Sequence, residues 1–123
     1  MSRQRAAQLH LTQRALADLQ QILEYSAQQW GRRVADDYIT GMEAALNRIQ
    51  EKPELLRAEP ALHPALTFYR VQKHLLVCDS QDRSIIVLTV IHATMDIPSR
   101  LADIQPQLAM EVELLHRQLR GGG

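Results

Sequence analysis

Hydrophobic residues recur at helical spacing near the start of the chain. The stripe consists of Leu16, Leu19, Leu23, Ala27 and Trp30. Positions three or four residues apart share one face of an α-helix, so this pattern predicts a helix. Thr12 can cap it by accepting a hydrogen bond from a free amide of the first turn. Gly31 can supply the left-handed residue that ends it.

A second stripe predicts a helix from about Arg33 to Glu51. It consists of Val34, Tyr38, Met42, Ala45 and Ile49. Pro53 stops this helix, because proline restricts the residue before it and offers no amide hydrogen. Only a very short turn separates the two helices, so we expect an antiparallel helix hairpin.

The second half of the chain changes to strand patterns. Leu66–Val71, Leu75–Asp79 and Ser84–His92 are rich in β-branched and other apolar residues, and gaps of hairpin length separate them. We therefore expect three consecutive antiparallel strands, after an irregular connection over residues 53–65. Ser84–His92 is apolar on both faces, which predicts a central strand covered on both sides. The alternating segment Gln8–Leu11 is a candidate edge strand.

The last segment is amphipathic. Pro98 can open a short helical turn through Ile104, and Pro106 can occupy the first position of a further helix that ends near Leu119. That helix carries an apolar stripe of Leu108, Val112, Leu115 and Leu119. The stripe must be covered, either by the chain's own sheet or by a partner or second copy.

The predicted order is β-α-α-β-β-β-α, which places the chain in the α+β class. A helix hairpin packs on one face of a small, largely antiparallel sheet. The length of 123 residues fits one domain over residues 1–120, with residues 102–120 as a C-terminal helical extension. Residues 121–123 are three glycines and are expected to form a flexible tail.

Charge and cysteine content exclude several classes of protein. Basic and acidic residues both number 14, so the net charge is zero, which argues against strong nucleic-acid binding by bulk charge. The single cysteine, Cys78, excludes a disulfide framework and a Cys-rich zinc site. Its apolar neighbours predict a small buried hydrophobe. No apolar stretch could span a bilayer and the N-terminus lacks a secretion signal, so we expect a cytoplasmic protein without a membrane anchor.

Candidate chemistry is sparse. The five histidines are scattered along the sequence, so no metal or cofactor is expected. Tyr69, Arg70, Lys73 and His74 could line a groove for an RNA phosphate, or they could be an edge strand and a polar hairpin. His92 ends the last strand, where it could act as a general acid or base, or be held by the following loop through Asp96.

A set of residues in a fixed order gives the chain a family resemblance. Met95–Leu101 is the most specific run. The other features are Leu11-Thr12, Ala15, Asp18-Leu19, Ile22, Tyr25, Trp30-Gly31, Ala35, Tyr38, Pro53, Tyr69-Arg70-Val71 and Val90-Ile91-His92. Together they cover about residues 8 to 101, and the chain resembles the ParE branch of the RelE/ParE superfamily of toxins from bacterial toxin–antitoxin modules.

The resemblance implies a function and partners. ParE-like toxins poison DNA gyrase by binding, without catalytic residues of their own. A ParD-like antitoxin, encoded beside the toxin, neutralises them in a toxin–antitoxin hetero-oligomer. The residues that the resemblance makes candidates for target contact are His92, Met95, Asp96, Arg100 and Leu101.

Two alternatives remain open from the sequence. The sister RelE branch cuts mRNA on the ribosome, and in that case Tyr69, Arg70, Lys73, His74 and His92 would line the catalytic site. Residues 84–99 contain no Lys or Arg to stabilise developing phosphate charge, which favours the gyrase branch. The third reading is an attenuated, non-toxic homologue that forms a homodimer through its C-terminal helix.

Overall fold

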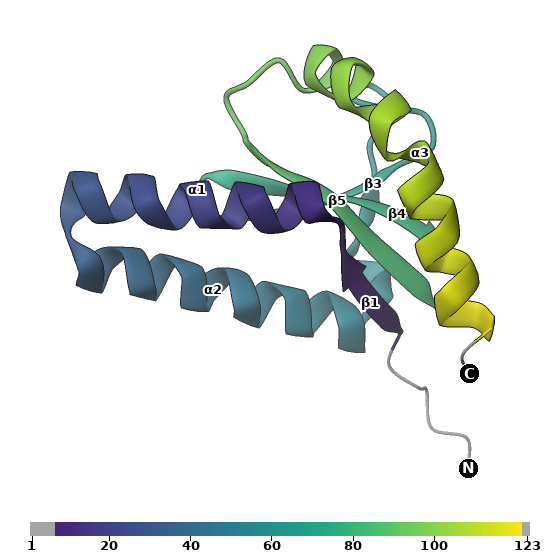
Figure 1. Cartoon of the computed structure of the whole chain (residues 1–123), viewed down its shortest axis with the longest axis horizontal. Helices are drawn as coiled ribbons and strands as arrows, with labels where there is room; N and C mark the ends of the chain where they lie inside the picture. Colours follow the sequence, from purple (N-terminus) through teal and green to yellow (C-terminus); the bar gives the residue numbers. More distant parts are fainter. Residues whose placement is uncertain (1–6, 122–123) are drawn as a thin grey trace.

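Five strands form one mixed sheet in the computed structural model, which describes residues 7–121 (Figure 1). The strands are β1 (Gln8–Leu11), β2 (Arg57–Ala58), β3 (Thr67–Val71), β4 (His74–Gln81) and β5 (Ser84–His92). Their spatial order is β1-β5-β4-β3-β2, with β1 parallel to β5 and the other neighbouring pairs antiparallel. The predicted α+β class and largely antiparallel sheet are therefore confirmed.

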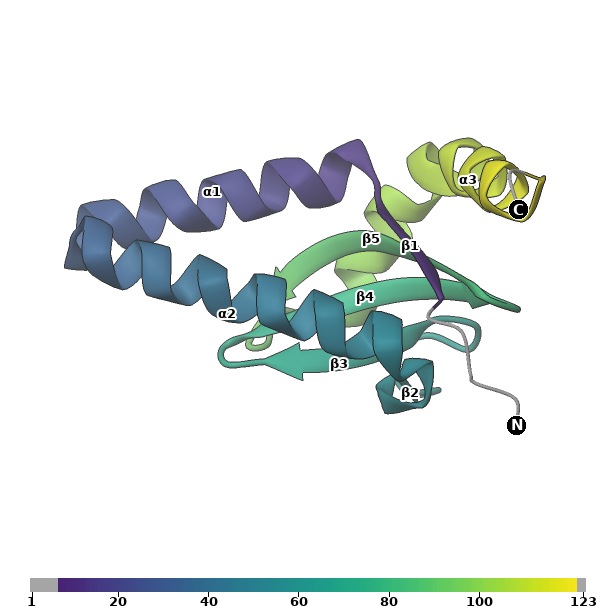
Figure 2. The same ribbon diagram turned by 90° about the horizontal axis from the view of Figure 1, so that it is seen from below.

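Two antiparallel helices, α1 (Gln13–Trp30) and α2 (Arg32–Glu51), cover one face of this sheet (Figure 2). The Thr12 hydroxyl accepts a hydrogen bond from the amide of Ala15 at 3.0 Å, as the sequence predicts. Gly31 joins the helices with φ 91° and ψ 165°. Its φ is positive but its ψ is extended, so the chain turns directly from one helix into the next.

β4 is longer than the predicted Leu75–Asp79, and the turns on both sides of it are tighter than expected. Val71 and His74 flank a two-residue turn whose first residue, Gln72, has φ 54°. Asp82 has φ 52° in the turn between β4 and β5. Positive φ in two-residue hairpins matches the right-handed twist of the strands. The connection expected to be irregular over residues 53–65 contains a 3-10 turn, η1 (Pro53–Leu55), and the short strand β2.

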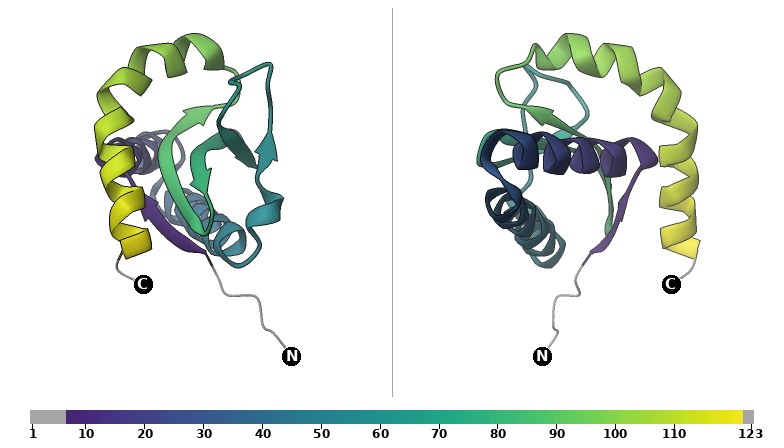
Figure 3. Two further views of the ribbon diagram at one scale, coloured as in Figure 1. Left: turned by 90° about the vertical axis from the view of Figure 1, so that its right-hand side faces the viewer. Right: turned by 60° about the vertical axis from the view of Figure 1, so that its left-hand side comes forward.

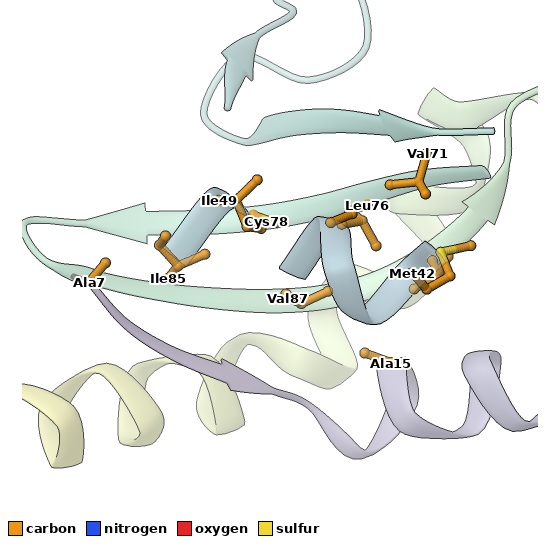
Figure 4. Packing of buried hydrophobic residues seen from close by; sticks show 11 residues of the cluster. Ala7, Ala15, Met42, Ile49, Val71, Leu76, Cys78, Ile85 and Val87 are labelled. Carbon is orange, nitrogen blue, oxygen red and sulfur yellow. The ribbon is translucent and has the colours of Figure 1, made fainter. Parts of the chain in front are cut away.

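The main core lies between the helix hairpin and the sheet (Figure 4). Met42 and Ile49 of α2 pack there with Leu76 of β4 and Val87 of β5, and all four are 0% exposed. β5 is buried along almost its whole length, which confirms the predicted central strand. A bulge shifts its register against β4 between Val77 and Cys78. The shift lets Val87 and Val90, three residues apart, reach the same cluster.

The C-terminal segment is one helix, α3 (Ile97–Gly121), with Pro106 inside it. The prediction of two pieces, with Pro106 opening the second, was therefore wrong. A proline lacks the amide hydrogen and crowds the preceding turn, so an interior proline bends a helix without necessarily ending it. Figure 3 shows α3 bending as it passes over the second face of the sheet, opposite the helix hairpin.

The apolar stripe of α3 packs on the chain's own sheet. Leu108 and Val112 join a second core cluster with Phe68, Ile86 and Leu88, and Leu115 and Leu119 lie at its edge. Of the two alternatives left open by the sequence, the structure has the intramolecular one. No helix within residues 7–121 is long and apolar enough to cross a membrane. The segment before Ala7, for which no secretion signal is expected, and residues 122–123 of the expected tail lie outside the described residues.

Candidate functional site

Tyr38, His74 and His92 meet at one end of the sheet. The tight β3–β4 turn places His74 at the start of β4, directly opposite His92 at the end of β5. Tyr38 reaches them from α2, and its ring lies edge-on to His74 with centroids 5.6 Å apart. The rings of His74 and His92 are also edge-on, at 5.1 Å. This Tyr38–His74–His92 cluster is partly exposed and is the candidate site for chemistry.

Two hydrogen bonds hold the Tyr38 hydroxyl in this cluster. The Tyr38 hydroxyl accepts from the backbone N–H of Lys73 at 3.2 Å and lies 2.6 Å from Nδ1 of His74. Because a phenol has one hydrogen to donate and its oxygen already accepts from Lys73, we infer that the hydroxyl donates that hydrogen to His74 Nδ1. Nε2 of the neutral His74 ring then carries the hydrogen.

Burial keeps both groups of this hydrogen bond neutral near pH 7. Desolvation lowers the pKa of His74 to about 4, with a further lowering by the charge of His92 and an opposing effect of Asp18. Burial likewise raises the pKa of Tyr38, against the hydrogen bond from Lys73 and the charge of Arg70. The cluster therefore offers polar contacts and protons to exchange, but little fixed positive charge.

His92 is held by the loop that follows it, through a different residue from the one expected. Its Nδ1 accepts from the Thr94 amide at 3.2 Å and lies 2.8 Å from the Thr94 hydroxyl. Asp96 instead binds the first turn of α3, where it accepts from the Ser99 amide at 3.3 Å and the Ser99 hydroxyl at 3.0 Å. An aspartate at a helix N-terminus satisfies amides that have no helical partner, which explains the choice.

The structure separates the other residues predicted for a nuclease site. Lys73 lies beside the cluster, and its Nζ is 5.8 Å from the centroid of the exposed Trp30 ring. Tyr69 packs toward α2, where its hydroxyl accepts from Arg48 at 3.2 Å. Arg70, the next residue along β3, alternates to the other face, and its Nε donates to the Gln72 carbonyl at 2.8 Å.

Tyr38 is the member of the cluster that was not predicted as a site residue. It occupied a position in the apolar stripe of the second helix, which indicated packing. The signal that could have found it is its polar tip, because a half-buried tyrosine hydroxyl needs a hydrogen-bond partner.

Of the residues predicted to contact the target, some lie on the surface and one lies in the core. Met95 is 49% exposed, and Asp96 and Arg100 are exposed as well. Leu101, by contrast, is 1% exposed and packs in the second cluster with Ile97. Ile97 and Leu101 lie one helical turn apart on the inner face of α3, so Leu101 belongs to the packing of that helix.

A second polar cluster, which the sequence did not indicate, ties α3 to the sheet. His116 is 0% exposed, its Nδ1 is in a very short contact with the Ser84 hydroxyl, and its Nε2 lies 3.1 Å from Oδ1 of Asp79. Ser, His and Asp in a chain are also the residues of hydrolytic triads. In a triad, however, Nε2 faces the serine and Nδ1 the aspartate. Here the order is reversed and Ser84 is 2% exposed, so the chain of hydrogen bonds serves packing.

Neither the cysteine nor the metal-ligating residues form a reactive centre within residues 7–121. Cys78 is fully buried, and burial, assisted by the charge of Asp79, raises the pKa of its thiol to about 12. This confirms the predicted role as a small buried hydrophobe. The described part of the chain gathers no group of three or more potential metal ligands.

Solved structures share the fold. The chromosomal ParDE toxin–antitoxin system from P. aeruginosa matches with a TM-score of 0.63 and 16% identity, over 71% of this chain and 96% of that one. A RelBE toxin–antitoxin complex from Mycobacterium tuberculosis matches with a TM-score of 0.54 and 14% identity, over 77% of this chain and 100% of that one. At such low identity the likeness concerns the fold alone.

Sequence comparison is more specific. Toxin ParE of Escherichia coli is 31% identical over 94 residues, which make up 76% of this chain and 91% of that toxin. The family model described as the ParE toxin of the type II toxin–antitoxin system parDE matches residues 9–97, from β1 to the first residue of α3. This chain therefore belongs to the ParE family of type II toxin–antitoxin toxins.

Proposed function

We propose that this chain inhibits DNA gyrase by binding to it, and that a ParD-like antitoxin neutralises it in a hetero-oligomer in the cytoplasm. The observation that carries the proposal is the continuous match to the ParE family over residues 9–97. That range includes β5 and the segment after it, with the exposed Met95 and Asp96. Arg100 follows one helical turn further on, so these three side chains form a surface available to a target.

The charges at the Tyr38–His74–His92 cluster support binding over phosphoryl transfer. Cleavage of RNA needs positive groups placed where negative charge develops on the phosphate. Burial holds His74 neutral, with a pKa of about 4. Lys73 lies over the Trp30 ring and the Nε of Arg70 is bonded to the Gln72 carbonyl, so each cation beside the cluster already has a contact.

A supercoiling assay tests the proposal. Purified gyrase and relaxed plasmid are titrated with the folded chain, and inhibition with accumulation of linear DNA is the expected result. Addition of the antitoxin should restore supercoiling. Absence of inhibition by chain whose fold has been verified would contradict the proposal.

Matched variants locate the surface. Met95→Ala and Arg100→Ala should each weaken inhibition, because both side chains are exposed in the proposed contact region. Met110→Ala and Arg117→Ala are the controls, since Met110 is 76% exposed and the Arg117 side chain is 67% exposed on the later turns of α3, beyond the proposed contact region around Met95 and Arg100. Equal effects of all four substitutions would remove Met95 and Arg100 from the target surface.

The second candidate function is ribosome-dependent mRNA cleavage of the RelE type. The Tyr38–His74–His92 cluster favours it, because these side chains could exchange protons with a substrate. Mapping of mRNA 5′ ends after induction would then reveal position-specific cuts that His92→Ala abolishes. A folded chain with neither activity would point to the attenuated homologue.

A further inference from the structure

His74 and His92 face each other across two neighbouring strands, β4 and β5. The next contact along the pair is a hydrogen bond from the Ala93 amide to the Lys73 carbonyl, at 2.9 Å. The two histidines therefore form a non-hydrogen-bonded pair, which is the position where facing side chains of antiparallel strands come closest. Strand pairing thus brings together two metal-ligating side chains that are far apart in the sequence.

Each of the two rings uses one nitrogen and leaves the other open. Nδ1 of His74 is bonded to the Tyr38 hydroxyl, and Nδ1 of His92 is bonded to Thr94. In the described part of the chain, neither Nε2 has a hydrogen-bond partner. Neither Nε2 is buried, because the one buried side-chain polar atom found there without a partner is Nε of Arg14. Two solvent-accessible imidazole nitrogens thus lie on closely paired side chains.

The other three histidines lack this combination. His63 and His116 have partners at both ring nitrogens. His10 is exposed on β1, beside the start of β5 and so away from the end that carries His92. Among the histidines of this chain, the His74–His92 pair therefore joins an open nitrogen to a neighbouring histidine.

The separation of the two rings fits a single metal ion. Zn²⁺ holds imidazole nitrogens at about 2.0–2.1 Å in a tetrahedral arrangement. Because the centre of an imidazole ring lies about 1.1 Å behind the ligating nitrogen, two such ligands have ring centroids about 5 Å apart. The centroids of His74 and His92 are 5.1 Å apart, with an angle of 74° between the rings. An ion shared by the two Nε2 atoms thus requires rotation of the rings but no movement of the strands.

We propose that His74 and His92 bind a divalent transition-metal ion of the Zn²⁺ class through their Nε2 atoms. Neutral imidazole is the commonest protein ligand of such ions. The described residues gather no group of three or more potential metal ligands, so water completes the coordination and the ion exchanges with solvent. This inference goes beyond inhibition of gyrase and does not depend on it.

The hydrogen-bond partners of Nδ1 suit the metal-bound form of both rings. When Nε2 binds the ion, the single hydrogen of each neutral ring moves to Nδ1. From there it is donated to the hydroxyl of Tyr38 or Thr94, and such an outer hydrogen bond orients a ligating histidine. The amide of the exposed Thr94, which also approaches Nδ1 of His92, then turns to water.

Titration with Zn²⁺ tests the proposal on the full chain, without a polyhistidine tag, gyrase or antitoxin. NMR should show saturable shifts of the His74 and His92 ring resonances, with one ion bound per chain. Mg²⁺ should shift neither ring, because it prefers oxygen ligands. Zn²⁺ should also raise the midpoint of thermal unfolding, since the paired site exists only in the folded chain. Absence of a saturable change at these two rings would overturn the proposal.

Matched variants identify the ligands. His92→Ala should lower the affinity for Zn²⁺ by at least about tenfold, measured by calorimetry. His10→Ala removes an exposed histidine outside the pair and should leave the affinity at the wild-type level. His92→Gln is closer in volume and replaces His92→Ala, should that variant fail to fold. Equal losses of affinity in the His10 and His92 variants would show that exposed histidines take up the ion singly, which would also overturn the proposal.

Discussion

The carboxylate of Asp18 in α1 takes the place of a missing strand beside Val90 in β5. Its Oδ2 accepts a hydrogen bond from the Val90 amide at 3.1 Å, and the Thr89 hydroxyl donates to the same oxygen. β1 ends at Leu11, which is paired with Val87, so the rest of β5 lacks a strand on this side. Asp18 thereby fixes the helix hairpin to the strand that carries His92.

We predict that Asp18→Ala lowers the free energy of unfolding by about 1–3 kcal/mol, because it leaves the buried Val90 amide without a partner. Urea denaturation measures the change. Asp36→Ala is the matched control, because Asp36 only pairs with the exposed Arg32 on the surface of α2. Such a pair contributes at most about 0.5 kcal/mol. Similar losses for both variants would show that Asp18 is an ordinary surface residue.

Replacement by alanine of the two glycines in the helix hairpin should have opposite effects on stability. Gly31 has φ 91° and ψ 165°, a conformation that side chains strongly disfavour, so Gly31→Ala should cost about 1–3 kcal/mol of stability. Gly41 lies inside α2, where a Cβ would meet the end of the Gln72 side chain at 2.8 Å. That exposed side chain can move away.

Gly41→Ala should therefore stabilise the chain by roughly 0.5–1 kcal/mol through helix propensity. Thermal unfolding of both variants beside the wild type checks the pair. A loss of stability in Gly41→Ala would mean that Gln72 is held in place.

Local patterns predicted most of the framework from sequence. Helix caps, turns and helical periodicity depend on residues close together in the sequence. The roles of Thr12, Gly31 and the apolar stripes could therefore be predicted without knowledge of the fold. The position of Pro106 was predicted wrongly because proline is compatible with two places in a helix. It is tolerated in the first turn, and inside a helix it produces a bend, and tertiary packing decides between the two.

The polar clusters depend on contacts between residues far apart in the chain. Asp18 meets Val90 across 72 positions and His116 meets Ser84 across 32. Nothing in the local sequence distinguishes His116 from a histidine on a solvated helix face. The same holds for Tyr38, whose partner His74 is fixed by the pairing of β3 with β4.

The thiol of Cys78 should resist modification in the folded chain. It is 0% exposed, and its pKa of about 12 keeps it protonated near neutral pH. We expect a disulfide reagent to react at the rate at which the protein opens, and rapidly once denaturant is added. Fast labelling of the native chain, at a rate proportional to reagent concentration, would contradict this burial.

His74 should make the stability of the domain depend on pH. Its pKa falls from 6.5 to about 4 on folding, so between these values the unfolded chain binds more protons than the folded one. The free energy of unfolding should therefore fall as the pH is lowered from about 6.5 to about 4. Below this window His74 is protonated in both states, and its contribution changes no further. His74→Gln should flatten this part of the profile.

Removal of the Tyr38 hydroxyl tests what lowers the pKa of His74. The hydroxyl lies 2.6 Å from Nδ1 of His74, and with the inferred donation to the neutral ring, Tyr38→Phe removes a contact that favours the neutral form and should raise the pKa of His74. NMR titration of the His74 ring resonances in both proteins measures the two values, with a midpoint near 4 expected for the wild type. A wild-type midpoint near 6.5, or one that Tyr38→Phe leaves unchanged, would show that the ring is solvated and that Tyr38 does not set its protonation.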